Sequence, residues 1–205
     1  MKSQKQMQMA IRAMRKQAGM TLMEIIAALA IIAAVVVGAL ALFNSAQSSN
    51  QSVTMLKDIV AVKAAAQGLY VGQGGYGAST FLNPVLVAAN KVPTDMSVTG
   101  TAATTQINTS LGGVLAVNSN AAGTNLVVTI SNVSPEICMQ LLTNASSGWS
   151  DVFVAATATG NNPTAATVSV FGAAAKTFPV TVAQAQAACV TTPAGNKLIS
   201  WNSIS

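Results

Sequence analysis

Few side chains in this sequence could do chemistry. The chain contains no histidine, and only 7% of its 205 residues are charged. Histidine is the commonest general base and metal ligand near neutral pH, so its absence argues against most enzymes and metal sites. The remaining candidates are two cysteines and five scattered acids: Cys138, Cys189, Glu24, Asp58, Asp95, Glu136 and Asp151. No nucleophile lies in a recognisable arrangement with a base, so we expect no catalytic residue, no metal and no cofactor.

The basic residues are concentrated at the N-terminus. The formal net charge is +5, from ten Lys and Arg against five Asp and Glu. Residues 1–19 contain no acid and hold half of these bases, namely Lys2, Lys5, Arg12, Arg15 and Lys16. The rest of the chain is neutral overall. A basic leader before a neutral body indicates membrane targeting rather than nucleic-acid binding, so we expect no nucleic-acid partner.

A long apolar run follows this leader. Residues 22–43 form an apolar segment that is interrupted only by Glu24. As a helix it is ~33 Å long at ~1.5 Å per residue, enough for a hydrocarbon core of about 30 Å. The positive-inside rule predicts a single pass with the N-terminus in the cytoplasm. An acid within such a span costs about 2.5–3.5 kcal/mol, which makes Glu24 a candidate functional residue.

The junction between the leader and the apolar run carries a family resemblance. Its order of basic leader, Gly19, apolar residues and Glu24 resembles the class III signal of type IV prepilins. The resemblance implies cleavage by a prepilin peptidase between Gly19 and Met20, methylation of the new N-terminus at Met20, and a role in assembly for Glu24. A plain membrane anchor is one alternative. An ordinary secretory signal is another, although its apolar region would span only about 7–15 residues.

The leader length, and Met20 after the cleavage position, are similar to the type IVb branch. The alanine-rich body resembles the pilins of thin conjugative pili or enteric adhesive pili. Such a body is exported, and an even cysteine count in an oxidising compartment favours a disulfide. A bond between Cys138 and Cys189 would resemble the disulfide that bounds the C-terminal region of type IV pilins. Two separate buried thiols are the alternative.

Helical spacing resumes after the polar residues 44–52. Residues 53–66 carry two apolar faces at helical spacing. These faces are Val53, Leu56 and Val60, and Met55, Ile59, Val62 and Ala66. We therefore predict one long helix over residues 21–67. One of its faces should pack on the chain's own domain, and the other on something else.

Residues 68–205 predict a head of the α+β class. Strands are expected at residues 114–117, 126–130, 152–156, 167–171 and 198–201. Ser134 suits an N-cap and Pro135 suits the first helical position, which predicts a helix over residues 134–144. A second short helix is expected over residues 182–188, and residues 78–110 should form an extended loop with a short helix. These elements predict an α+β fold with an antiparallel β-sheet, and the family resemblance implies that the long N-terminal helix packs against this sheet, as in the type IV pilin fold.

The expected organisation is a leader (1–19), a long helix (20–67) with a membrane or filament-core segment (20–43), and a head (68–205). The resemblance implies the structural subunit of a bacterial surface filament for adhesion, aggregation or conjugative mating contact. It would sit in the inner membrane before assembly and in an extracellular pilus afterwards. Its partners would be copies of itself in a helical homopolymer, a prepilin peptidase and the pilus assembly machinery. The alternatives are a minor pilin, a secretion-system pseudopilin and a membrane-anchored periplasmic binding module.

Overall fold

The computed structural model describes residues 21–144, 148–157, 163, 169–171, 176–190 and 195–203. The chain divides into two compact units, Met1–Ser45 and Ala46–Ser205. Helix α2 (Leu22–Leu69) begins in the first unit and ends in the second. By length and composition, its N-terminal part could cross a membrane.

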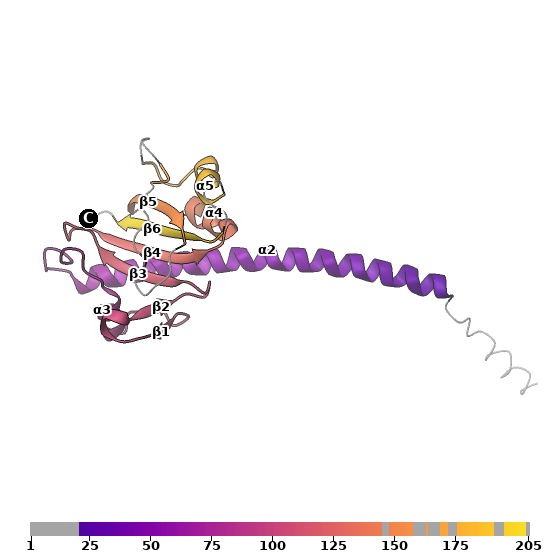
Figure 1. The fold of residues 1–205 in the computed structure, drawn as a ribbon, viewed down its shortest axis with the longest axis horizontal. Coiled ribbons are helices and arrows are strands. Elements are labelled where there is room, and N and C mark those ends of the chain that lie inside the picture. Colours follow the sequence, from indigo (N-terminus) through magenta and orange to yellow (C-terminus); the bar gives the residue numbers. More distant parts are fainter. Residues whose placement is uncertain are drawn as a thin grey trace, which may run out of the picture. The chain divides into compact units, whose positions relative to one another are not determined.

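Helix α2 is continuous over its full length (Figure 1). It begins where the Thr21 side chain accepts a hydrogen bond from the backbone N–H of Glu24, at 3.3 Å. The polar residues 44–52 are helical as well. The helix ends two residues beyond the predicted residue 67, and Gly72 (φ +84°) then turns the chain through the left-handed region that favours glycine.

The head contains a six-stranded antiparallel sheet, so the predicted α+β fold is confirmed. The strand order is β1-β2-β3-β4-β6-β5, which places the last strand between β4 and β5 (Figure 1). The strands are β1 (Ser97–Thr99), β2 (Gln106–Asn108), β3 (Val114–Ser119), β4 (Leu126–Val133), β5 (Trp149–Ala156) and β6 (Lys197–Ser203). Four of the five predicted strands correspond to β3, β4, β5 and β6.

The core lies between the second half of α2 and the sheet. Strands β3 and β4 contribute cross-strand apolar pairs, Leu115 opposite Ile130 and Val117 opposite Val128. Helix α2 contributes one of its two predicted apolar faces, Met55, Ile59, Val62 and Ala66, all of them buried. At roughly 1.5–3 kcal/mol for a fully buried large apolar side chain, this face stabilises the head substantially.

The prediction for residues 78–110 was incomplete. The segment contains the expected short helix, α3 (Asn83–Ala88), but also β1, β2 and a 3₁₀ helix, η1 (Ala102–Thr104). Both strands are only three residues long. All of β1 is exposed and β2 buries Ile107 alone. Neither strand therefore shows the two-residue apolar alternation from which a strand can be predicted.

The strand predicted over residues 167–171 was wrong for the part that the structure describes; residues 167 and 168 lie outside it. Ser169 forms an isolated bridge with Phe153 of β5, and Phe171 lies in a turn. The Ser169 hydroxyl donates to Asp151 and accepts from the backbone N–H of Phe171, at 2.9 and 3.3 Å. The bond between the Ser169 hydroxyl and the backbone N–H of Phe171 is local and competes with a strand ladder, and Val170 and Phe171 lie in a turn.

Two helices complete the head, as predicted. They are α4 (Pro135–Asn144) and α5 (Val182–Cys189). The Ser134 hydroxyl accepts a bond from the backbone N–H of Ile137 at 3.4 Å, which caps α4. In α5, Thr181 and Gln184 form a capping box in which each side chain accepts a bond from the other residue's backbone N–H.

Candidate assembly surface

The N-terminal half of α2 exposes an apolar surface that is interrupted only by Glu24. Thirteen large apolar side chains between Leu22 and Phe43 are each at least 42% exposed. At ~1.5 kcal/mol or more per side chain, burying them would release on the order of 20 kcal/mol. Such a helix requires lipid or other apolar helices around it. Glu24 is the acid in the first turn of this surface.

In the second unit, the outer face of α2 forms a stripe of exposed residues along the helix. Val53 and Val60 remain 48% and 46% exposed, and Lys57 lies exposed between them. Ala61 and Ala64 continue the same side of the helix with small side chains. These five residues, called here the outer stripe, include Val53 and Val60 of the second apolar face seen in the sequence. Leu56, assigned to that face from the sequence, instead packs partly on the core.

Polar contacts between α2 and the head reinforce the core packing. The Ser52 hydroxyl lies 2.6 Å from the Gln140 side-chain oxygen of α4. Lys63 donates to the backbone carbonyl of Gly148, and its ammonium lies 4.4 Å from the centre of the Trp149 ring. Burial lowers the pKa of the Lys63 ammonium. The contacts of Lys63 could not be predicted from the sequence, because their partners lie some 85 residues further along the chain.

Cys138 and Cys189 form a disulfide, with their Cα atoms 5.9 Å apart. Both cysteines are fully buried, Cys138 in α4 and Cys189 in the last turn of α5. The bond joins two short helices and confirms the pairing that the family resemblance implied. It closes a loop that includes β5 and the segment leading to α5.

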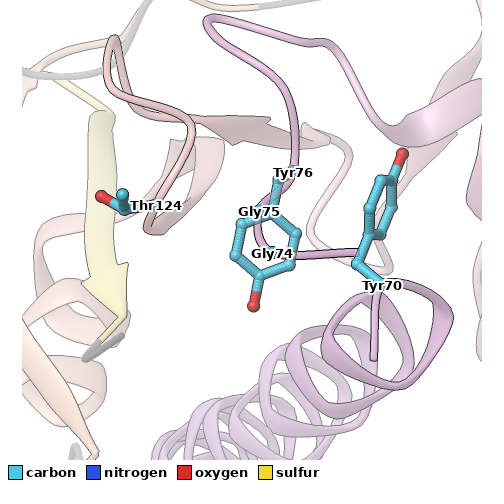
Figure 2. A pocket seen from close by; sticks show the side chains of 5 residues that line it. All are labelled: Tyr70, Gly74, Gly75, Tyr76 and Thr124. Atoms are coloured by element: carbon cyan, nitrogen blue, oxygen red, sulfur yellow. The ribbon is translucent and has the colours of Figure 1, made fainter. Parts of the chain in front are cut away.

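A shallow cavity of about 330 Å³ lies where α2 ends. It is lined by Tyr70, Gly74, Gly75, Tyr76 and Thr124 (Figure 2). The two tyrosine rings are 5.4 Å apart and inclined at 60°. Gly75 permits a close approach to the turn between β3 and β4, since a Cβ there would lie 2.9 Å from a backbone oxygen. The lining offers two phenols and one hydroxyl but no carboxylate, amine or thiol, so it holds no base that could activate them.

The structure covers the predicted site residues unevenly. Gly19 and Met20 lie outside the described residues. Glu24 is in the first turn of α2, and the two cysteines are bonded to each other. Among the described residues, no group of three or more Cys, Asp or Glu side chains could hold a metal ion.

Comparisons with known families agree with this architecture. A long N-terminal helix packed on a six-stranded antiparallel head gives this chain a fold similar to that of solved type IV pilins. Residues 49–204 match the family model described as PilS N terminal, and residues 14–40 match the prokaryotic N-terminal methylation motif. Because the first match covers more than half of the chain, the protein belongs to the PilS family.

Individual proteins are also similar to this chain over most of its length. Two curated relatives, from Escherichia coli O127:H6 and O111:H-, are each 27% identical over 88% of this chain and 91% of their own length. Both are named major structural subunit of bundle-forming pilus. A type IV b pilin from Salmonella typhi has a similar fold (TM-score 0.52, 22% identity, 74% of this chain, 99% of that one). So does the type IV pilin TcpA from Vibrio cholerae El Tor biotype (0.52, 14%, 77% and 99%).

Proposed function

We propose that this protein is the structural subunit of a type IVb pilus and polymerises through helix α2. The observation that carries the proposal is the exposed apolar surface of residues 22–43 on a chain of the PilS family. The names of the E. coli relatives support the same role. The match to the methylation motif supports removal of residues 1–19 by a prepilin peptidase, cleaving between Gly19 and Met20 and followed by methylation of Met20.

The apolar helix surface explains how one protein could occupy two environments. Before assembly, residues 22–43 cross the inner membrane once, with the basic leader on the cytoplasmic side. During assembly, the helix leaves lipid and packs against the same helix of neighbouring copies. Its apolar side chains stay out of water in both states, so transfer between them avoids the large cost of hydrating that surface.

Glu24 would set the position of each incoming copy. Cleavage after Gly19 creates a positive amine at Met20, four residues before the Glu24 carboxylate. In a filament core of low polarity, an unpaired charge is costly, and a paired one is tolerated. Pairing Glu24 of one copy with the Met20 amine of its neighbour satisfies both charges and fixes the axial register. The alternative is a glutamate that only extends to the lipid headgroups.

The outer stripe and the head would form the outer contacts. Val53 and Val60 offer apolar area, and Ala61 and Ala64 let a neighbouring backbone approach closely. Beyond the leader, the chain has no net charge, which favours close packing of many copies. The name of the E. coli relatives also supports lateral association between filaments. We assign adhesion, aggregation or mating contact to residues 68–110 and to the region bounded by Cys138 and Cys189.

The test is the filament yield of Glu24 variants in cells without a wild-type copy. Glu24→Val should leave export, cleavage and the folded head intact, yet abolish or sharply reduce the filaments sheared from the surface. Glu24→Asp retains the charge and should keep part of the yield. Glu136→Gln removes an exposed acid of α4 and serves as the control. A normal filament yield from Glu24→Val would show that charge pairing does not drive assembly.

A further inference from the structure

A buried acid on α2 has no role in the assembly scheme above. Asp58 is 8% exposed and lies on the inner face of the helix, among Met55, Ile59 and Val62. Its Oδ2 atom is buried and has no hydrogen-bond partner among the described residues. An ionised carboxylate in that position is unfavourable unless a hydrogen-bond donor or a positive charge compensates it.

The neighbouring acid is Asp95, in the segment that joins α3 to β1. Its carboxyl group is exposed to solvent and close enough to Asp58 for a side-chain hydrogen bond once one of the two carries a proton. Burial is the main cause that raises the pKa of Asp58 to about 7, followed by the hydrogen bond with Asp95 and by its charge. Lys57, the neighbouring charge on α2, acts in the opposite direction.

We propose that the carboxyl group of Asp58 holds a proton and donates it in a hydrogen bond to Asp95, and that this bond fastens the α3–β1 segment (residues 89–96) onto helix α2. With the proton bound, the hydroxyl of Asp58 donates to a carboxylate oxygen of Asp95. When the proton leaves to solvent, two adjacent carboxylates face each other and the segment is held less tightly. The buried side chain of Met96, next to Asp95, then becomes exposed more often.

The direction of the pH dependence follows from the two states of Asp58. In the fastened state its pKa is about 7, and in the released state it returns towards the ordinary 3.8. The fastened state therefore binds the proton more tightly and is favoured most at low pH. Its advantage falls as the pH rises from about 4 to 7 and changes little above that range. Between pH 5.5 and 7.5, the equilibrium for release should rise roughly 20-fold.

Hydrogen–deuterium exchange of the full mature chain in detergent micelles tests this directly. The measured quantity is the protection of amides in residues 91–99, relative to the intrinsic exchange rate at each pH. Wild-type protection should fall roughly 20-fold between pH 5.5 and 7.5. Asp58→Asn keeps a hydrogen-bond donor and removes the titration, so its protection should not change with pH. Asp95→Asn, at an exposed position, removes the two lesser causes and leaves the burial of Asp58, so its change should be smaller than in the wild type without being abolished.

Glu136→Gln removes one negative charge at an exposed site of α4 and should retain the full wild-type pH dependence. The proposal is overturned if wild-type protection of this segment is constant over the pH range. It is also overturned if the 20-fold change persists in Asp58→Asn, because the proton would then be bound elsewhere. Neither result depends on filament assembly, so the proposed function can fail or succeed independently.

Discussion

Removing the Cys138–Cys189 disulfide should destabilise the head by about 4 kcal/mol. The two cysteines are separated by 51 positions, and closing a loop of that length restricts the unfolded chain by about 4 kcal/mol at 25 °C in the chain-entropy relation. The head depends on this bond because α5 is only eight residues long and buries only Ala185 and Cys189. Against a total stability of about 5–15 kcal/mol, such a loss would leave little reserve.

The assay is urea unfolding of the full mature chain in detergent, comparing the oxidised wild type with the Cys138→Ala/Cys189→Ala double variant. Reduced wild type serves as a second comparison, because it loses the bond and keeps both sulfur atoms. Both forms should lose about 4 kcal/mol, with a small additional loss in the double variant from the deleted sulfurs. A reductant should not affect the double variant. A loss below about 1 kcal/mol in reduced wild type would refute the view that the bond limits the unfolded state.

Three further substitutions test the packing of the head and the outer stripe. Asn83→Ala removes two hydrogen bonds to the backbone of β3, at 2.8 and 2.9 Å, and should cost about 2 kcal/mol in urea unfolding; an unchanged midpoint would contradict this. Lys63→Met removes the bonds to Gly148 and Trp149 but keeps the chain length, and should cost about 1–2 kcal/mol; a melting temperature equal to the wild type's would count against the contact. Val60→Asp should change head stability by less than about 0.5 kcal/mol but lower the filament yield several-fold, and wild-type yield would show that the outer stripe packs on no neighbouring copy.

Helix α2 and the four longer strands could be predicted from the sequence because each carries its own local pattern. The apolar run and the helical spacing predicted the length of α2 and its two apolar faces, and the structure shows that the face with Met55, Ile59 and Val62 is the buried one. Ser134 and Pro135 likewise predicted the start of α4. In each case the signal lies within a few residues of the element that it determines.

Other parts of the fold depend on contacts that no short window contains. Strand β1 buries none of its three residues, so only its pairing with β2 makes it a strand. The position of β6 between β4 and β5 also follows from long-range packing rather than from order in the chain. In the described part of the strand predicted over residues 167–171, Ser169 bonds to Asp151, 18 positions earlier, a contact that no two-residue alternation reveals.

The functional residues also fall into those that could be predicted from the sequence and those that could not. Glu24 could be identified from the sequence because it is the only charged residue in the apolar run of residues 22–43. Asp58 carries a weaker form of the same signal, since it lies on the face defined by Met55, Ile59 and Val62. Its partner Asp95 could not be predicted, because only the folded chain brings the α3–β1 segment against α2. The contact between Lys63 and Trp149 could not be predicted for the same reason, since the two residues are far apart in the sequence.

The central claim is that this chain is processed as a prepilin and then polymerises. Intact-mass and N-terminal analysis of the subunit in sheared surface filaments tests it most directly. We predict a chain that begins at Met20, carries one methyl group on its terminal amine, and contains the Cys138–Cys189 disulfide. A mature protein that begins elsewhere, for example at Gln47, or a cell surface without filaments containing this chain, would contradict the account.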